Sequence, residues 1–211
     1  MNDVASNLYS AIKSNLVCLH PTDSIPGLTF DPNSGDAQAS LERIKGRVGK
    51  QGYIGLVADF DVAQKFWQPL PGKWKTILSE MWPCPLSVGW LANEKCPRSL
   101  LADDGTACFR FPSLKGQEWL RDVMRALDFP LPTTSVNRTG TPAIVEWGEA
   151  VDWAKSDSNV FSYELPFPTK GQALPSTLIK IAANGTFSVL RPGCFDVSKI
   201  EKYFSSEGSR S

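Results

Sequence analysis

The apolar positions of this chain recur with a helical period in some segments and form short runs in others. Residues 116–128 show the clearest helical period, because their apolar side chains fall on one side of a helix. Residues 1–16 have the same period and predict an amphipathic N-terminal helix. Further helices are predicted over residues 36–47, 62–67, 73–82 and 145–154. Short apolar runs bounded by Gly, Pro or Asn predict strands over residues 15–23, 52–60, 83–92, 106–113, 176–182 and 187–193.

The order of these elements predicts the fold class. Strands and helices alternate without a strict βαβ repeat, and the Asn184–Gly185 turn between the last two strands is typical of a hairpin. We therefore expect one α/β domain over residues 1–204, with a twisted mixed sheet and flanking helices. Residues 129–143 are bounded by prolines and rich in hydroxyls, which predicts a loop. The polar residues 205–211 predict a disordered tail.

Composition narrows the classes of function. Basic and acidic residues number 22 each, so the chain has no net charge and any charge signal must be local. No apolar run approaches the ~20 residues that span a bilayer, and the N-terminus lacks the apolar core of a secretory signal. The 5 cysteines are widely spaced with no C-x-x-C pair, which predicts reduced thiols in a cytoplasmic protein. A single histidine excludes a His-rich metal site.

Two stretches combine a rigid backbone with polar side chains. "HPTDSIPGLTFDP" (residues 20–32) follows an apolar run and sets hydroxyls and an acid between two prolines and a glycine. A simple turn needs only one Pro-Gly or Asp-Gly signal, so the additional hydroxyls predict a binding site. "TTSVNRTG" (residues 133–140) likewise combines consecutive hydroxyls with Asn137.

Two further segments carry positive charge in positions that suit an anion. "RIKGRVGK" (residues 43–50) has no acid, and its glycines allow the cations to converge on one ligand. These cations are Arg43, Lys45, Arg47 and Lys50. Lys acts as a point charge and Arg as a bidentate fork for phosphate or carboxylate oxygens. Arg110 lies mid-strand among apolar neighbours, where a cation is costly unless an anion or a ligand meets it.

Each of these features also has a purely structural explanation. Thr22 and Ser24 are residue types that cap helices or close turns. Lys45 and Arg47 suit a solvated helix end, where the helix dipole favours cations. Arg110 could pair with a structural carboxylate.

The common catalytic motifs are absent. G-x-x-x-x-G-K-[ST], G-x-G-x-x-G and G-x-S-x-G do not occur in the sequence, which argues against P-loop, dinucleotide-binding and α/β-hydrolase chemistry. A Ser-His-Asp triad would need His20, whose neighbours Asp23 and Ser24 share one tight loop and leave no room for the usual geometry. We therefore interpret His20 as a structural histidine.

Taken in chain order, the motifs resemble those of the YrdC/Sua5 family. "PTDSIPGL" is similar to the family's PT(D/E)xxxG(L/V), and "KGRV" to its KxRP. "WPCPLS" is similar to WPGP(L/V)T, "FRFP" to VRxP and "TSVNRTG" to TSANxSG. "PSTL" and "LRPG" are similar to PST(V/L) and LRxG. The blocks run in the family's order from about residue 10 to 195, and the chain resembles the short, single-domain members.

The resemblance implies a fold and an activity. The fold is a YrdC-like domain around a basic cavity, and the activity is that of a threonylcarbamoyl-AMP synthase. Such an enzyme converts L-threonine, bicarbonate and ATP to threonylcarbamoyl-adenylate and pyrophosphate, with Mg²⁺ accompanying ATP and no protein-bound metal. Its product serves the threonylcarbamoylation of adenosine 37 in tRNA, through a downstream threonylcarbamoyl-transferase complex.

The resemblance also implies roles for individual residues. The catalytic pair is Lys45 and Arg47, which contact the triphosphate. The expected ATP-binding residues are Lys45, Arg47, Gln51, Thr106, Ser135, Asn137 and Arg191. The expected threonine-binding residues are Thr22, Ser24, Arg110, Thr133 and Ser176, with Arg110 on the carboxylate. The reaction gathers negative charges in one place, so it needs cations and donors more than a nucleophilic side chain.

The chain departs from the family pattern at several positions, and other functions stay open. The departures are Val48, Leu56, Cys84, Phe109, Val136 and Arg138. None of them removes a charged ligand, so we expect the activity to survive. One alternative is a module of this fold that binds double-stranded RNA or tRNA, mainly through the backbone. Another is a paralogue that makes a different carbamoyl-adenylate.

Overall fold

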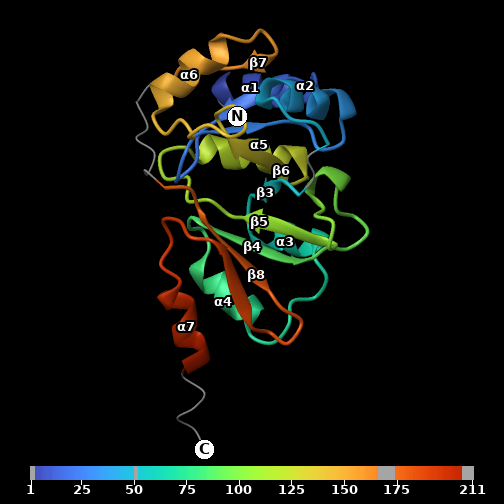
Figure 1. Ribbon diagram of the computed structural model, residues 1–211, viewed down its shortest axis with the longest axis vertical. Helices are drawn as coiled ribbons and strands as arrows, with labels where there is room; N and C mark the ends of the chain where they lie inside the picture. Colours follow the sequence, from blue (N-terminus) through green and yellow to red (C-terminus); the bar gives the residue numbers. More distant parts are fainter. Residues whose placement is uncertain (1–2, 50–51, 166–173, 206–211) are drawn as a thin grey trace, which may run out of the picture.

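A nine-stranded sheet organises the part of the chain that the computed structural model describes, which comprises residues 3–49, 52–165 and 174–205 (Figure 1). The strands are β1 (Val17–His20), β2 (Gly27–Thr29), β3 (Ile54–Leu56), β4 (Leu86–Leu91), β5 (Thr106–Arg110), β6 (Leu131–Ser135), β7 (Val160–Phe161), β8 (Thr177–Ile181) and β9 (Phe187–Arg191). They lie in the spatial order β7-β1-β2-β6-β3-β5-β4-β8-β9. Neighbours are antiparallel except in the pairs β1–β7, β3–β5 and β4–β8, which confirms the prediction of a mixed sheet.

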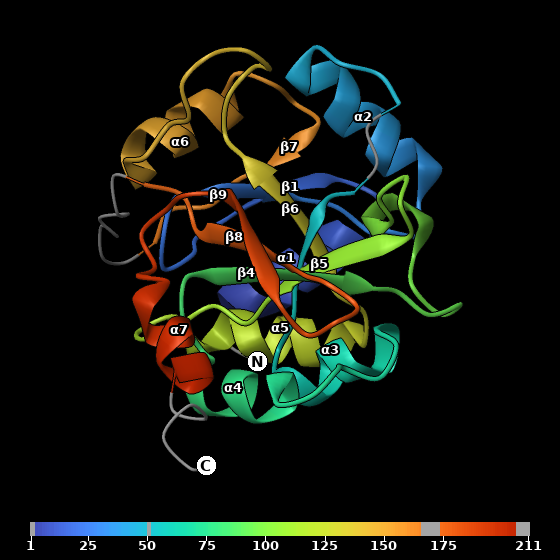
Figure 2. The same ribbon diagram turned by 60° about the horizontal axis from the view of Figure 1, so that its bottom comes forward.

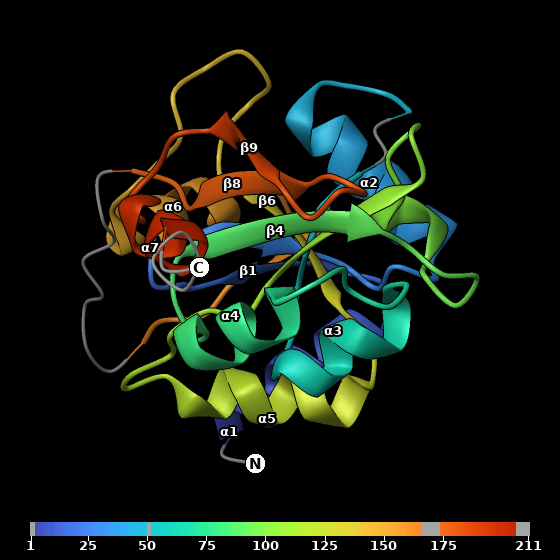
Figure 3. The same ribbon diagram turned by 90° about the horizontal axis from the view of Figure 1, so that it is seen from below.

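Helices cover both sides of this twisted sheet, as Figures 2 and 3 show. They are α1 (Asp3–Lys13), α2 (Gly35–Lys45), α3 (Phe60–Phe66), α4 (Trp74–Met81), α5 (Glu118–Leu127), α6 (Trp147–Lys155) and α7 (Ser198–Ser205), with a 3₁₀ turn at Arg98–Leu100. In both views α3, α4 and α5 lie on one side, whereas α2 and α6 lie on the other. Within the described ranges, no helix combines the length and apolar character that crossing a membrane requires.

Two clusters of buried apolar side chains hold the layers together. The smaller one joins α1 and α5 to β1, β3 and β6, and it includes Leu8, Ile12, Leu120 and Leu131. The larger one joins α2, α4 and α6 to the central strands, and it includes Leu41, Trp74, Val88 and Ala150. Burial of each large apolar side chain contributes about 1.5–3 kcal/mol. The clusters therefore fix the strands, and with them the polar segments that leave the strand ends.

Most of the predicted elements are confirmed to within a few residues. The helices predicted over residues 1–16 and 116–128 are α1 and α5, and the predicted C-terminal hairpin is β8 and β9. Helix α1 ends at Lys13 because Asn15 adopts a left-handed conformation with a φ of 63°. The cysteines are free thiols, as predicted.

The prediction of a loop over residues 129–143 is wrong at its centre, where β6 pairs with β2 and β3. Its prolines indicate a loop locally, but two β-branched threonines and a partner strand on each side favour an extended backbone. The sequence analysis also did not predict β2, which lies inside the polar stretch 20–32, nor α7. Ser205, the first residue of the predicted tail, ends α7, and residues 206–211 lie outside the described residues.

Candidate functional site

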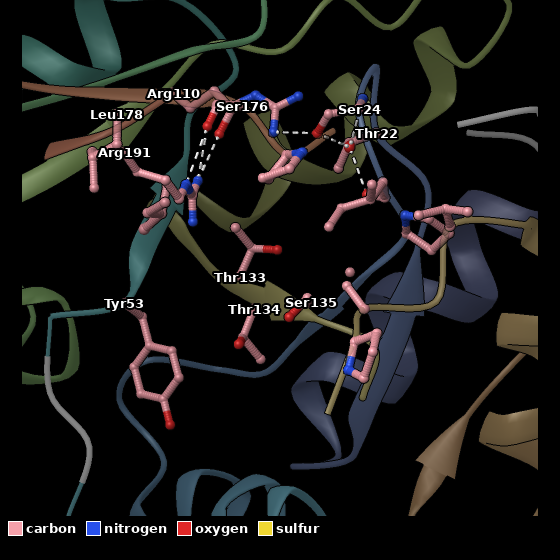
Figure 4. A pocket seen from close by; sticks show the side chains of 18 of the residues that line it. Thr22, Ser24, Tyr53, Arg110, Thr133, Thr134, Ser135, Ser176, Leu178 and Arg191 are labelled. Carbon is pink, nitrogen blue, oxygen red and sulfur yellow. Dashed lines mark hydrogen bonds between the residues drawn. The ribbon is translucent and has the colours of Figure 1, made fainter. Parts of the chain in front are cut away.

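A cavity of about 580 Å³ lies where side chains from β3, β5, β6, β8, β9 and the loop after β1 face one another (Figure 4). Its cationic lining residues are Arg47, Arg110 and Arg191. Its hydroxyl-bearing lining residues are Thr22, Ser24, Tyr53, Thr133, Thr134, Ser135 and Ser176. None of the described residues that line it is acidic. A chain without net charge therefore concentrates positive charge at one place, which suits an anionic ligand.

The structure brings together most of the residues that the sequence placed in separate motifs. Those that line the cavity are Arg47, Ser135 and Arg191 of the predicted nucleotide site, and Thr22, Ser24, Arg110, Thr133 and Ser176 of the predicted threonine site. Their individual roles stay predictions. What the geometry adds is that side chains from distant segments can contact one ligand.

Arg110, at the end of β5, is held by the polar stretch that follows β1. Its Nη1 donates to Ser24 Oγ over 2.9 Å, and its Nη2 donates to Asp23 Oδ1 in an ion pair. Asp23 Oδ2 also accepts from the backbone N–H of Ser113 at 2.7 Å. Burial lowers the pKa of the Arg110 guanidinium to about 9, which leaves it charged at neutral pH beside the carboxylate. Arg110 thus does pair with a carboxylate of the protein, as the structural explanation requires, and Asp23 neutralises its charge.

Two hydroxyls extend this network, and their donor and acceptor roles follow from their partners. Thr22 Oγ1 donates to the carbonyl of Ile25 at 2.8 Å, so it can only accept from Ser24 Oγ, which lies 3.1 Å away. Ser24 Oγ therefore gives its proton to Thr22 and accepts from Arg110. Arg110 Nε is buried without a hydrogen-bond partner among the described residues.

Arg191, at the end of β9, lies near Ser176 and Arg110 in Figure 4. Its Nη2 donates to the carbonyl and to the hydroxyl of Ser176, over 3.0 and 3.2 Å. Ser176 Oγ lies 2.9 Å from Ser87 Oγ, and both serines are buried. Burial lowers the pKa of Arg191 below its ordinary value. Among the described residues its hydrogen-bond partner, Ser176, is a neutral residue.

Arg47 emerges from a tight loop at the end of α2. Gly46 ends the helix in a left-handed conformation with a φ of 69°, which suits glycine. The backbone carbonyl of Glu42 then accepts from Arg47 N at 2.9 Å, and its carboxylate accepts from Gly49 N at 2.7 Å. The Arg47 guanidinium lies over the Tyr53 ring, 5.3 Å from its centroid, with Nε and Nη2 unpartnered in the described part of the chain. These buried donors are placed for an anion.

Lys45 does not line the cavity, but it contacts Ser135, which does. It is only 2% exposed, which rules out the solvated helix end. Its Nζ donates to the carbonyl of Ser135 at 2.6 Å and to Asn137 Oδ1 at 2.5 Å. Ser135 Oγ donates to the same Oδ1 at 2.7 Å, so Lys45, Ser135 and Asn137 form one network. Burial, together with the charge of Arg47, lowers the pKa of Lys45 to about 8.

Two of the remaining predicted or candidate residues are not among the lining residues, and a third lies outside the described residues. Thr106, at the other end of β5 from Arg110, donates to Asp104 Oδ1 at 2.6 Å and is not among the lining residues. Gln51 lies outside the described residues. Arg43 pairs with Asp157 at 3.2 Å and its side chain is 56% exposed, so it does not join the other cations.

The departures from the family pattern have different surroundings. Val48 is 95% exposed at the tip of the loop that carries Arg47, whereas Leu56 and Val136 are fully buried in the two apolar clusters. Cys84 is half-buried beside the larger cluster, and burial raises its pKa to about 12, so it stays a neutral thiol. None of these side chains lines the cavity among the described residues.

Among the residues at or next to the cavity that were not assigned to it from the sequence are Tyr53, Asp23 and His20. Tyr53 is a lining residue, and its ring lies under the Arg47 guanidinium. Asp23 neutralises Arg110, and His20 contacts the hydroxyl of Thr133 over 2.8 Å. Of these three residues, only Asp23 could have been assigned to the site from the sequence, because it lies between Thr22 and Ser24.

Protein-bound metal has no candidate ligands in the described ranges, where no group of three or more His, Cys, Asp or Glu side chains could hold an ion. Asp23, which contacts the lining residue Arg110, is already paired with Arg110 and with the backbone N–H of Ser113. The residues present therefore suit anions and do not suit a resident cation.

The sequence was compared with those of known families. The model of the family Sua5_yciO_yrdC, described as "Telomere recombination", matches residues 10–193. The chain belongs to the Sua5/YciO/YrdC family. The resemblance of the motifs is thereby confirmed over most of the chain.

Individual relatives agree with this family. A threonylcarbamoyl-AMP synthase of Methylobacillus flagellatus is 28% identical over 194 residues, which cover 89% of this chain and 99% of that protein. One of Halorhodospira halophila is 34% identical over 82 residues, and this match spans 39% of this chain and 43% of that protein. Among solved structures, Sua5 of P. abyssi complexed with L-threonine has a TM-score of 0.79 at 20% identity. That match covers 94% of this chain but 56% of Sua5, and it shows the shared fold.

Proposed function

We propose that this protein is a threonylcarbamoyl-AMP synthase, which converts L-threonine, bicarbonate and ATP to L-threonylcarbamoyladenylate, pyrophosphate and water. The observation that carries the proposal is the convergence of Arg47, Arg110 and Arg191 with seven hydroxyl-bearing side chains in one cavity of about 580 Å³. A cavity of several hundred Å³ is the size that holds small molecules and cofactors. Relatives named for this activity match most of the chain.

The proposed reaction has two parts. The amino nitrogen of threonine first forms a bond to the carbon of bicarbonate, one C–O bond of bicarbonate breaks, and its oxygen leaves as water, which gives a carbamate. A carbamate oxygen then attacks the α-phosphorus of ATP, and the bond from that phosphorus to the bridging oxygen breaks as pyrophosphate leaves. Both parts bring anions together, so the main tasks of the protein are to hold them in line and to offset their repulsion.

The buried donors divide these tasks between two ends of the cavity. Arg47 has two unpartnered N–H groups and lies next to the Lys45 network, which suits the triphosphate. Arg110 is neutralised by Asp23 and offers one unpartnered N–H, which suits a single carboxylate oxygen of threonine. Arg191, whose hydrogen-bond partner among the described residues is the neutral Ser176, adds positive charge close to Arg110. No side chain has to act as a nucleophile.

Magnesium enters this proposal with ATP. Mg²⁺ keeps several waters and binds mainly through substrate phosphates, so it needs few protein ligands. When bound, the ion would neutralise part of the triphosphate charge. We further propose that the adenylate passes to a threonylcarbamoyl-transferase complex acting on tRNA in the cytoplasm.

The test is a mass-spectrometric search for the adenylate after the protein is incubated with L-threonine, bicarbonate and Mg²⁺–ATP. Pyrophosphate release should require all three substrates. Arg47→Ala should lower the rate by about 100-fold, the size seen when one donor to a developing charge is removed. Arg43→Ala, in helix α2 just before the loop that carries Arg47, is the matched control, and it should stay within about twofold because an exposed ion pair contributes little. Pyrophosphate release that does not depend on threonine would favour a paralogue that makes another carbamoyl-adenylate.

A further inference from the structure

His20 is the only histidine of the chain, and its hydrogen bonds define which ring nitrogen carries the proton. The imidazole is fully buried at the end of β1. Its Nδ1 lies 3.0 Å from the carbonyl of Pro21, and its Nε2 lies 2.8 Å from Thr133 Oγ1. A carbonyl oxygen can only accept, so Nδ1 must be the protonated nitrogen. Nε2 of the neutral ring is then an acceptor, and the Thr133 hydroxyl must donate to it.

The protonation state of the ring supports this assignment. Burial lowers the pKa of His20 to about 4, and the nearby charge of Arg110 acts in the same direction. The ring is therefore neutral at physiological pH. A neutral ring with a protonated Nδ1 has one acceptor, and the Thr133 proton occupies it.

The sheet is built to allow this contact. His20 on β1 pairs with Gly27 on β2, and β2 in turn pairs with β6, which carries Thr133. Neighbouring strands lie about 4.8 Å apart, so the ring must pass over β2 to reach β6. A Cβ at position 27 would come within 2.5 Å of His20 Nε2 and 2.6 Å of Thr133 Oγ1. Only glycine leaves room for the bond.

The consequence appears inside the cavity. Thr133 is among the side chains that face the cavity in Figure 4, whereas His20 is not a lining residue. The single hydroxyl proton of Thr133 points to His20, so the oxygen can only accept hydrogen bonds from a ligand. The three arginines that line the cavity, by contrast, can only donate hydrogen bonds. Thr133 is thus an acceptor of fixed polarity beside donors for anions.

We propose that His20 is a positioning residue, which fixes the Thr133 hydroxyl as the acceptor for the amino group of the amino-acid substrate. This inference rests on the proposed function. A protonated amino group only donates, and a neutral one donates two N–H bonds, so an acceptor of fixed polarity suits it. The side-chain hydroxyl of threonine can donate or accept and needs no such fixed partner. His20 acts through Thr133 without touching the substrate.

The first test uses the wild-type protein. Because the chain has one histidine, a long-range ¹H–¹⁵N correlation spectrum shows a single imidazole that needs no assignment by mutation. We expect the neutral tautomer with the proton on Nδ1 at pH 7, and a change in the Nε2 shift on addition of L-threonine. A proton on Nε2, or a charged ring at pH 7, would overturn the inference.

The second test is a double-mutant cycle. His20→Phe keeps an aromatic ring and removes the acceptor, and Thr133→Val keeps the shape and removes the hydroxyl. Each should raise the KM for L-threonine about tenfold and leave the KM for ATP within about twofold, as expected for one hydrogen bond. The double variant should be no worse than Thr133→Val alone, because His20 acts only through that hydroxyl. Additive losses, or equal losses for both substrates, would contradict the positioning role.

Two controls separate the possible outcomes. L-2-aminobutyrate lacks the side-chain hydroxyl of threonine, and its binding should weaken in His20→Phe by the same factor as that of L-threonine. A loss confined to L-threonine would assign Thr133 to the hydroxyl and overturn the choice of the amino group. A wild-type protein that binds no L-threonine would overturn the proposed function as well. Equal binding by wild type and His20→Phe would overturn the positioning role alone.

Discussion

Acid stability offers a direct measure of how completely His20 is buried. The pKa of its imidazole is lowered from 6.5 to about 4 in the folded protein, chiefly because burial penalises the charged ring. Above pH 6.5 neither the folded nor the unfolded chain protonates this ring. As the pH falls below 6.5 the unfolded chain takes up the proton and the folded protein does not, so the free energy of unfolding decreases. The decrease ends near pH 4, where both forms are protonated.

The size of the effect follows from the two pKa values. Each pH unit between them corresponds to about 1.4 kcal/mol, so this histidine removes roughly 3 kcal/mol of stability between pH 7 and pH 4. Carboxylates lose stability in the same pH range, and a variant is needed to isolate the histidine. His20→Phe retains those carboxylates and lacks the imidazole. At pH 7 it should be less stable by about 1–3 kcal/mol, because it leaves the Pro21 carbonyl and the Thr133 hydroxyl without their partner.

The assay is urea unfolding of both proteins at pH values from 4 to 7, with the difference in free energy plotted against pH. At pH 7 the free energy of unfolding of His20→Phe should be lower than that of the wild type. We expect this difference to shrink as the pH falls and to disappear near pH 4. A proton NMR titration of the single imidazole in the wild type checks the folded pKa independently. A difference that stays flat with pH, or an NMR pKa near 6.5, would refute the reasoning.

Three further perturbations have expected outcomes. The pKa of Lys45 is lowered to about 8, so its positive charge is lost as the pH rises through 8. The affinity for ATP, measured by calorimetry, should therefore weaken between pH 7 and 9. Lys45→Met should bind ATP weakly at all these pH values. Asp23→Asn leaves the buried guanidinium of Arg110 without its counter-charge, and the free energy of urea unfolding should fall by about 3 kcal/mol. Gly27→Ala forces a methyl group against the imidazole and should lower that free energy by about 3 kcal/mol. Gly148→Ala is its control, since a methyl there meets no atom within 4 Å in helix α6, and it should be neutral or stabilising by about 0.5–1 kcal/mol.

The local pattern of the sequence predicts the elements that depend on local signals. Helix α5 is predicted well because its apolar side chains recur on one face, and β8 and β9 are predicted because a turn separates two apolar runs. Strand β6 is missed because its prolines favour a loop and its stability comes from β2 and β3. The information that makes it a strand lies in segments about eighty or more residues away along the chain.

In the candidate site, too, local sequence patterns predict some features, and contacts between distant segments decide others. Arg47 and Arg110 stand out in the sequence because each is a cation beside glycine or apolar residues, whereas Arg191 is indicated by the resemblance to the family, and all three line the cavity. Lys45 stands out equally, yet its ammonium group binds the carbonyl of Ser135 and not the cavity. The contact between His20 and Thr133 has no signal, since the two residues are 113 positions apart. Pattern reasoning finds the charges, but pairing of strands decides which groups they meet.

The partners of the three arginines explain why the cavity can hold two different anions. Arg110 already has Asp23 as its counter-ion, so a ligand there gains one hydrogen bond from Nε but little net charge. Arg47 has no counter-ion among the described residues that line the cavity, and Arg191 has only neutral partners. A highly charged triphosphate gains most at the two uncompensated arginines, whereas a carboxylate of single charge is adequately served at Arg110. For the proposed reaction we therefore expect the triphosphate away from Asp23 and the threonine carboxylate beside Arg110, with Thr133 as the acceptor for the amino group.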